Sequence, residues 1–365
     1  MLITVAEKEL HVLLTHVTRY RTLLLLSEDP RKWIISSTPR FGYFAYLATL
    51  YVEGASTDWM DLLFRAGNTP VLVDLLLHMH DHSQLSLLSL PYHQLQRLTI
   101  SNCTSTVHDL LSTLRRASPR LQFFSITYWR NPRPPPGTAS PHGNNITFPF
   151  LLDLNIPFLF RLSHKLFNIG IIQRFHTPRL RRLRLGEMNT LGLSSLAPFF
   201  HAISSTLTEI ILKGDLGAPN YCNTFLATLR PMKGIEILSV TMSFPPSQYS
   251  PGNLNFLIDA LRFPESVVGE SGSANEEEVL GLFNQLMFPK LNDLTLKNWE
   301  LSVRRLEVMV QSRTQSWLDG NRCPSLGRLK VIHLDGIRAE ESERDLGWLD
   351  GMVKEGILVR DGSEL

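Results

Sequence analysis

Three histidines alternate in the run His78-Met-His80-Asp-His82, and they form the one metal-like cluster of the sequence. On an extended strand alternate side chains point the same way, so two of these imidazoles could share a zinc or copper ion. The run stands where a strand pattern gives way to a loop, and no Cys, Asp or His elsewhere is an obvious further ligand. Because histidine tracts alone are weak evidence, we expect a polar loop here, and we expect no cofactor elsewhere in the chain.

The densest basic patch gathers five arginines within eleven residues: Arg174, Arg179, Arg181, Arg182 and Arg184. Such a patch could hold a phosphate, an acidic peptide or RNA, and an ordinary solvated surface accounts for it equally well. Aromatic residues do not interleave with these arginines, and the formal net charge of the chain is only +2. We therefore expect neither nucleic acid nor a membrane surface as a partner.

Motifs of catalysis are missing from the sequence. We find no GxSxG, no HExxH, no Walker loop, and no GxGxxG between a strand and a helix. A catalytic site assembled only by the fold would escape this search. The expectation is nevertheless a protein that is not an enzyme.

A leucine phrase recurs along the chain and sets its organisation: leucine, two variable residues, leucine, one variable residue, leucine. Its copies begin at Tyr20, Leu47, Leu72, Leu95, Leu121, Leu151, Leu180, Leu207, Ile235 and Leu291. Successive copies lie about 23–30 residues apart, close to the period of leucine-rich repeats. The step from Ile235 to Leu291 is twice as long, so one unit there has either lost its signature or holds an insertion. The array is best supported from about residue 47 to 334. Near its end a phrase starting at Leu326 competes with one starting at Leu329.

Each repeat combines two periodicities. The Leu183-x-Leu185 alternation has the period of a short strand with one buried face, while Val107, Leu110 and Leu114 have helical spacing. Thr106 with Asp109 resembles a capping box ahead of that helix. A strand and a helix cannot bury both apolar faces alone, but stacked repeats can. The sequence therefore predicts an α/β fold: a leucine-rich-repeat solenoid, or horseshoe, with a parallel concave β-sheet and convex helices over residues 1–365.

The strand register predicts which side chains face a partner. Residues that alternate with the buried leucines should lie on the concave side of the sheet. They are Arg97, Thr99, Phe123, Asp153, Asn155, Arg182, Arg184, Glu209, Lys213, Asp293 and Lys297. Their charges are mixed, which favours a protein ligand. The predicted function is a non-catalytic protein-binding scaffold.

The pattern resembles the long leucine-rich repeats of F-box proteins, especially the divergent fungal ones. Their Leu-x-x-Leu-x-Leu-x-x-Cys form stands as Leu95-Gln-Arg-Leu98-Thr-Ile100-Ser-Asn-Cys103. The resemblance covers nearly the whole chain and implies a substrate-recognition role in a ubiquitin ligase. In that family an N-terminal F-box holds the Skp adaptor. No Leu-Pro-x-Glu start of an F-box precedes the first repeat, and only the segment from Trp33 to Pro39 is similar to the end of one. A Skp partner is expected only if an F-box lies upstream of Met1.

Two other functions stay open. Leucine-rich GTPase-activating proteins of the Ran type regulate a GTPase, but their repeats are shorter and more regular than these. A truncated F-box paralogue without a ligase role is the other alternative.

Two segments interrupt the repeat. Residues 130–147 hold five prolines and predict an exposed loop, which could also present a polyproline motif to an SH3 or WW domain. Residues 263–278 predict an acidic Gly/Ser loop that leads into a helix near Glu277.

Composition places the chain in a reducing compartment. Hydrophobic residues are 43% and charged residues 19%, enough apolar material for a continuous core. The three cysteines match no zinc spacing, so we expect free and mostly buried thiols. The first residues lack the pattern of a signal peptide, and no apolar stretch reaches the length of a membrane helix. The expected location is the cytoplasm or the nucleus.

Overall fold

The structure is a computed structural model, and fifteen segments of the chain are described in it. They are residues 2–4, 19–26, 44–53, 69–78, 90–130, 145–156, 171–215, 222–242, 255–262, 286–298, 300–315, 329–335, 338–339, 343–356 and 358–360. Contacts divide the chain into two compact units. Unit 1 comprises Met1–Phe158 and Gly170–Leu180, and unit 2 comprises Leu159–Ile169 and Arg181–Leu365. The single array expected over residues 1–365 stays a prediction.

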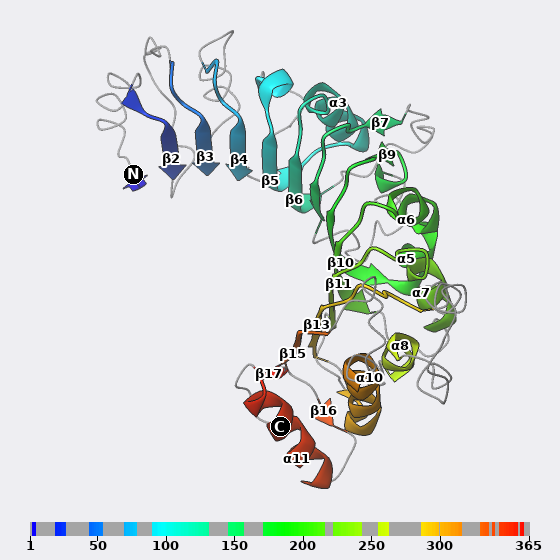
Figure 1. Ribbon diagram of the computed structural model, residues 1–365. Coiled ribbons are helices and arrows are strands. Elements are labelled where there is room, and N and C mark those ends of the chain that lie inside the picture. The colour runs from blue at the N-terminus through cyan, green and yellow to red at the C-terminus, as the bar shows by residue number, and fades with distance from the viewer. Residues whose placement is uncertain are drawn as a thin grey trace. The chain divides into compact units, whose positions relative to one another are not determined.

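Unit 1 is built on a parallel sheet whose strands follow one another in chain order (Figure 1). The strands are β1 (Leu2–Thr4), β2 (Thr22–Leu26), β3 (Thr49–Glu53), β4 (Asp74–His78), β5 (Arg97–Thr104), β6 (Phe123–Arg130) and β8 (Asp153–Ile156). A 3-10 turn, η4 (Tyr92–Gln94), and helix α3 (Val107–Ala117) form a second layer beside this sheet. Two short strands, β7 (Ile146–Thr147) and β9 (Phe175–His176), pair with each other outside the main sheet.

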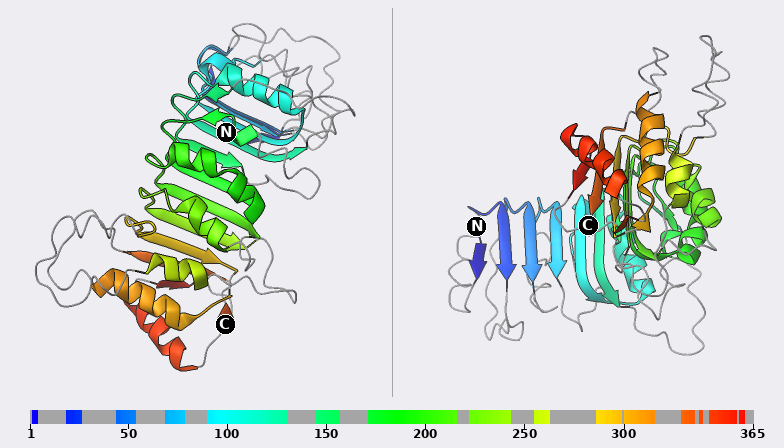
Figure 2. Two further views of the ribbon diagram at one scale, coloured as in Figure 1. Left: turned by 90° about the vertical axis from the view of Figure 1, so that its right-hand side faces the viewer. Right: turned by 90° about the horizontal axis from the view of Figure 1, so that it is seen from below.

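Unit 2 repeats the same plan with more helix. Its parallel strands are β10 (Arg182–Asn189), β11 (Glu209–Asp215), β12 (Ile237–Met242), β13 (Asp293–Lys297), β15 (Val331–Asp335) and β17 (Leu358–Arg360). Its helices are α5 (Thr190–Ser195), α6 (Ala197–Ile203), α7 (Cys222–Leu229), α8 (Asn255–Leu261), α10 (Val303–Gln315) and α11 (Glu343–Lys354). A two-stranded pair joins β14 (Glu300–Leu301) to β16 (Arg338–Ala339). Helices α5–α10 line one face of the strands (Figures 1 and 2). The α/β class and the parallel sheet are thus confirmed.

The leucine phrase forms the core as its alternation predicts. In β3, β4, β13 and β15 the burial alternates along the strand, with the phrase residues inside and their neighbours half-exposed. Leu50, Leu75 and Leu98 are fully buried and stand opposite one another in register on β3, β4 and β5. Each such side chain contributes about 1.5–3 kcal/mol when removed from water. A row of these leucines therefore stabilises the packing of neighbouring strands and keeps their core side chains on one face of the sheet.

Helix α3 confirms the expected second half of a repeat. Thr106 is its N-cap and accepts a hydrogen bond from the backbone N–H of Asp109, while its hydroxyl donates to the Asp109 carboxylate. The side chains of its predicted stripe are buried: Val107, Leu110, Leu111, Leu114 and Ala117. The cap satisfies a helix N–H that would otherwise lack a partner, and the stripe provides the packing energy.

A backbone interaction recurs between successive strands of each unit. The carbonyl of the residue just before a strand accepts hydrogen bonds from two consecutive N–H groups of the next repeat. Val73 O, for example, accepts from Gln96 N at 2.8 Å and from Arg97 N at 2.9 Å. The same acceptor role belongs to Arg21, Ala48, Gln96 and Gln122 in unit 1 and to Arg181, Thr208, Glu236 and Asn292 in unit 2. The repeats therefore share backbone geometry as well as sequence.

The long step between Ile235 and Leu291 is an insertion and not a worn repeat. Strands β12 and β13 pair directly, with Leu238 opposite Leu294 and Val240 opposite Leu296, so no further strand lies between them. Arg313 of α10 ties the described ends of this insertion together. Its guanidinium donates to the carbonyl of Leu261 at 2.7 Å and to that of Met287 at 3.0 Å.

Because Arg313 is buried, its charged guanidinium depends on hydrogen-bond acceptors within the protein. The side chain is fully buried, and desolvation lowers its pKa to about 10, so it still carries its charge at neutral pH. It also donates to the carbonyl of Phe288, whose backbone has a φ of 51°. A buried cation is tolerated only with several hydrogen-bond acceptors, and these carbonyls supply them.

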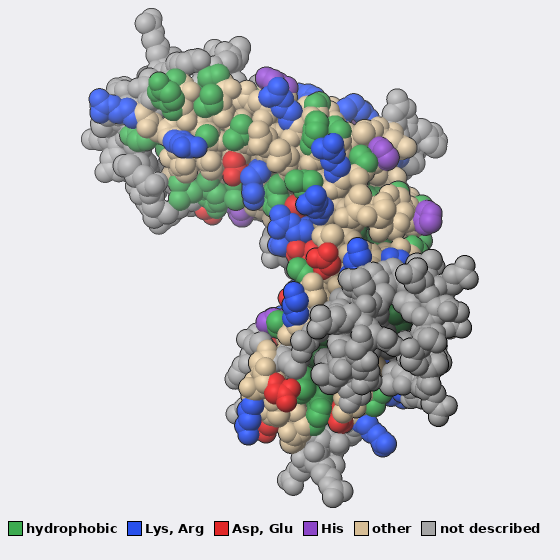
Figure 3. All heavy atoms as spheres, viewed as in Figure 1, with side chains coloured by type: hydrophobic (Ala, Val, Ile, Leu, Met, Phe, Trp, Pro, Cys, Tyr) green, Lys and Arg blue, Asp and Glu red, His purple; other side chains and the backbone are tan. Residues whose placement is uncertain are grey.

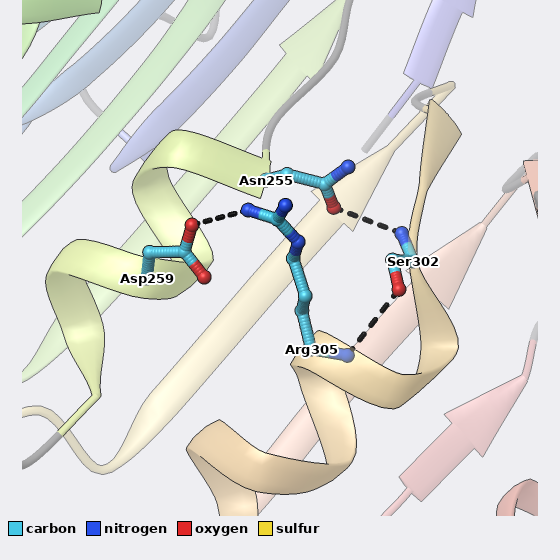
Figure 4. Close-up of polar contacts among 4 residues, drawn as sticks. All are labelled: Asn255, Asp259, Ser302 and Arg305. Carbon is cyan, nitrogen blue, oxygen red and sulfur yellow. Dashed lines mark hydrogen bonds and ion pairs between the residues drawn. The ribbon is translucent and has the colours of Figure 1, made fainter.

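A second contact between α8 and α10 is polar and lies nearer the surface (Figure 4). The side-chain oxygen of Asn255 accepts the backbone N–H of Ser302 at 2.9 Å, and the Ser302 hydroxyl accepts the N–H of Arg305. The Arg305 guanidinium pairs with Asp259 where both side chains are about half exposed. Ser302 and Asn255 thus cap the start of α10.

The structure settles the register that the sequence left open near the end of the array. The phrase starting at Leu329 is the one used, because Ile332 and Leu334 of β15 pair with Leu294 and Leu296. Strands β1 and β17 and helix α11 extend the two units beyond the best-supported part of the array, from residue 47 to 334. Residues 131–144 and 263–285 lie outside the described residues, so the expected loops there and the helix near Glu277 stay predictions.

We predict that Gly214→Ala destabilises the protein, because β10 carries a bulge beside this glycine. Leu185 pairs with Leu212 but Met188 pairs with Gly214, so β10 has one extra residue here. A Cβ at Gly214 would lie 2.0 Å from the carbonyl oxygen of Met188. The free energy of unfolding in urea should fall by about 3 kcal/mol. The matched change is Gly347→Ala in α11, where an added Cβ would meet no atom within 4 Å. This change should leave the free energy of unfolding unchanged or raise it slightly. Equal effects of the two changes would contradict the bulge.

A second prediction compares two arginines of one helix that both reach α8. Arg313→Lys removes the planar set of donors and should lower the free energy of unfolding by about 3 kcal/mol, because buried carbonyls lose their partners. Arg305→Lys affects a half-exposed ion pair and should cost less than about 1 kcal/mol. Urea denaturation followed by circular dichroism measures both. A small effect at Arg313 would show that the ends of the insertion are held by other contacts.

Candidate protein-binding face

Each sheet has one face that the leucine core does not use, and we call it the open face. In unit 1 it consists of three rows of residues that stand opposite one another on neighbouring strands. The first row is Thr22, Thr49, Asp74, Arg97, Phe123 and Asp153; the second is Leu24, Tyr51, Leu76, Thr99, Ser125 and Asn155; the third is Leu26, Glu53, His78, Ser101 and Thr127.

The open face of unit 2 has the same construction. Its first row is Arg182, Glu209, Ile237, Asp293 and Val331; its second is Arg184, Ile211, Ser239, Thr295 and His333; its third is Lys213, Thr241, Lys297 and Asp335. All eleven positions predicted to face a partner fall in these rows. Their placement on the strands is therefore confirmed, and their contact with a partner stays a prediction. Asp153 departs from the others, because only 4% of its surface is exposed.

Arg97 of the open face of unit 1 contacts side chains on both neighbouring strands. Its Nε lies 3.6 Å from a carboxylate oxygen of Asp74 on β4, and its guanidinium carbon lies 4.5 Å from the ring centroid of Phe123 on β6. The side chain is still 57% exposed. Stacking and pairing hold the guanidinium in one orientation across three strands, so less entropy is lost when a partner binds it.

The arginines of the predicted basic patch have different surroundings within their units. Arg184 Nη2 lies 3.5 Å from Glu209 Oε1 on the next strand, so its charge is largely compensated. Arg179 lies at the turn before β10 and stacks on Phe150, with 5.4 Å between the guanidinium carbon and the ring centroid. Only Arg182 and Arg184 belong to the open face. The patch therefore contributes two cations to this face and not five.

Opposite charges are interspersed on the described surface (Figure 3). Lys297 Nζ pairs with Asp335 across β13 and β15 at 3.2 Å. Between charged positions lie hydrogen-bonding groups, as where the Asn155 amide donates to the Ser125 hydroxyl at 3.1 Å. A face of this kind has a weak long-range field and many short-range donors and acceptors. That suits recognition of a protein surface better than of a polyanion.

Sequence reasoning missed the part of the open face on β3 and β4. Tyr51 and Leu76 stand opposite each other between Glu53 and Asp74. The register rule applied to Leu50-x-Val52 and Leu75-x-Leu77 contained this signal. Burial raises the pKa of Asp74, against the opposing effect of Arg97. Burial, followed by the negative charge of Glu53, raises the pKa of Tyr51.

His78 lies in the third row, and its Nδ1 is 3.1 Å from the hydroxyl oxygen of Ser101. His80 and His82 lie outside the described residues. Within the described part of the chain, no three His, Cys, Asp or Glu side chains are grouped so as to hold a metal ion. The histidine run therefore stays a weak prediction of a metal site.

Cys103 lies near the end of β5, at the last position of the Leu-x-x-Leu-x-Leu-x-x-Cys phrase. Its thiol is free and fully buried, 3.6 Å from the hydroxyl of Ser105, to which it donates. Burial raises its pKa to about 11; Asp109 adds to this rise and the Ser105 hydroxyl opposes it. The expectation of a free buried thiol is confirmed for this residue, which serves the core and not nucleophilic chemistry.

Comparisons with known proteins identify no family: no protein-family model matches the chain, and no curated protein matches its sequence. No helix among the described residues is long and apolar enough to cross a bilayer.

The raised pKa of Cys103 predicts slow alkylation. At pH 8 only about one thiol in a thousand would be ionised, and the core shields it further. Iodoacetamide should therefore label Cys103 at least tenfold more slowly in the native protein than in 8 M urea, as followed by mass spectrometry of its peptide. Labelling of the native protein should rise as the pH approaches 11, because the thiolate is the reactive form. Rapid native labelling at pH 8 would contradict the burial.

Proposed function

We propose that this chain is a leucine-rich-repeat solenoid that works as a non-catalytic, protein-binding scaffold. The observation that carries the proposal is the register. In both units it sets the apolar phrase on one face and a mixture of charged, hydroxyl and aliphatic side chains on the other, to which unit 1 adds Tyr51 and Phe123. A parallel sheet with helices over one face leaves its other face for a ligand.

The chemistry of the open face supports a protein partner. Arg97 on Phe123 is the kind of aromatic and arginine pair that often dominates protein interfaces. The ion pairs Arg184–Glu209 and Lys297–Asp335 set a fixed pattern of charge that a partner must match. Affinity would come from complementary shape and a few anchors more than from net charge.

The finer proposal follows from the resemblance to F-box proteins. In it the open face captures the substrate of a ubiquitin ligase in the cytoplasm or the nucleus, and a Skp adaptor joins only through an F-box. The support is the phrase that ends at Cys103. The backbone leaves the regular strand conformation at one residue of this phrase. Strand β5 continues to Thr104 through Asn102, whose φ is 53°.

The test of the surface is site-specific cross-linking. A photoreactive amino acid at Thr99 or Ser239, in the second rows, should cross-link a discrete partner in cell extract. The same group at His108 of α3 or Asn223 of α7, both exposed in the helical layer, should not. Equal cross-linking from both layers, or none from the open face, would overturn the proposal. Skp and cullin in the bound fraction would support the ligase role, and their absence would count against it.

Charge reversal tests the predicted arginines. The double change Arg182→Glu with Arg184→Glu should lower affinity for the cross-linked partner at least about tenfold, because it replaces two cations of the open face with carboxylates beside Glu209. The control is Arg115→Glu with Arg120→Glu, which changes the same charge at exposed positions in and after α3. Titration calorimetry or interferometry gives both constants. Unchanged binding by the Arg182 and Arg184 variant would show that β10 lies outside the interface.

A further inference from the structure

We propose that the open face across β3 and β4 recognises a basic side chain of the partner, next to an aliphatic or aromatic one. This inference rests on the proposed protein-binding function and specifies the partner's chemistry. The site consists of Tyr51 and Leu76, with Glu53 and Asp74 on either side. We call it the acidic trough.

The middle row of this site, which we call its floor, is mainly apolar, and its one polar group, the Tyr51 hydroxyl, donates a hydrogen bond to the Glu53 carboxylate at 3.4 Å. Leu24, Tyr51 and Leu76 stand in register on three adjacent strands, and each remains only half-buried. In the same row on β5 and β6 the residues change to Thr99 and Ser125. The apolar contact area is thus confined to the first strands of the row, where it can receive a small number of side chains.

The two carboxylates stand at opposite ends of this floor. Glu53 follows Tyr51 by two residues along β3, and Asp74 precedes Leu76 by two residues along β4. Strand geometry separates their rows by about 13 Å, with the apolar row midway. A lysine or arginine could lay its aliphatic stem over Tyr51 or Leu76 and carry its charge to either carboxylate.

The charges nearby favour a cation. Among the side chains described in the three rows of β2, β3 and β4, Glu53 and Asp74 are the only carboxylates, and no lysine or arginine accompanies them. The nearest open-face cation is Arg97 on β5, which faces Asp74 at 3.6 Å; Arg21 precedes β2, outside the rows. Burial raises the pKa of Asp74 despite Arg97, so this carboxylate is partly desolvated without full compensation. An incoming cation would compensate it, whereas an acidic side chain would be repelled.

The experiment is a selection from a phage-displayed random dodecapeptide library on the immobilised full chain. Peptides eluted with free protein should be enriched in lysine or arginine beside leucine, isoleucine, valine or an aromatic residue. A synthetic copy of the dominant peptide should bind more weakly as salt increases. Its affinity should fall at least about tenfold for Glu53→Lys and about threefold or more for Asp74→Asn.

Two controls keep the result interpretable. Glu355→Lys, an exposed acidic residue after α11, makes the same charge change away from the open face and should leave affinity within about twofold. Circular dichroism melting of each variant separates lost binding from lost folding. Selection on the Glu53→Lys variant itself should move the preference from basic toward acidic peptides.

The outcomes distinguish this inference from the proposed function. Selected peptides that cross-link from Thr99 but show no basic preference, or that bind Glu53→Lys unchanged, overturn the acidic trough and leave the binding face intact. Peptides that cross-link only from His108 or Asn223, or a selection that yields no binder, overturn the trough, and the first of these results counts against the open face as well.

Discussion

The rest of this structure depends on the backbone carbonyl that precedes each strand and accepts two consecutive N–H groups from the following repeat. The interaction recurs from Arg21 to Gln122 in unit 1 and from Arg181 to Asn292 in unit 2. It fixes where each new strand starts beside its predecessor. Because side chains alternate along a strand, a slip of one residue would expose every core leucine and bury the opposite face. The buried leucines and the carbonyl hydrogen bonds therefore enforce the same register. The leucines do so through packing, and the hydrogen bonds do so because they are directional.

In that register a few backbone positions require a positive φ. Asn102 and Asn298 occupy the same place in their repeats, two residues after the last phrase residue, and both have a positive φ, of 53° and 60°. Asparagine tolerates this conformation better than most residues, so the backbone adopts it here without the entropy cost of glycine. Phe288 has a similar φ without that tolerance, and Arg313 holds its carbonyl. Arg313 thus joins the described segments on either side of the insertion, together with the pairing of β12 with β13 and the contact of Asn255 with Ser302.

Sequence predicted what depends on periodicity and missed what depends on pairing in space. The alternation within the leucine phrases, as around Leu98 and Leu183, placed eleven residues on strand positions that the core does not use, and Thr106 with Asp109 marked the start of α3, because these signals are local. The pairing of β12 with β13 is not local, so the choice between insertion and worn repeat required coordinates. The same holds for Arg184 with Glu209 and for Arg179 with Phe150. Long side chains reach several neighbours, and their sequence spacing does not choose among them. The sequence did not predict strands β1 and β17, because three residues are too few to show an alternating pattern.

The open face draws its selectivity from the compensation of its own charges. Asp74, Arg97 and Phe123 form one continuous contact across three strands, so a partner that pulls Arg97 toward itself weakens its pair with Asp74. A basic side chain in the acidic trough would have the reverse effect, because it replaces Arg97 as the counter-ion of Asp74 and frees the guanidinium to turn outward on Phe123. Binding at the trough and binding at Arg97 would then favour each other. A partner that carries a basic and an acidic residue one strand spacing apart, about 5 Å, would gain from both, whereas a uniformly charged polymer would gain from one and be repelled by the other. The mixed charge of this face is therefore a physical reason to expect a folded or extended protein segment as its ligand.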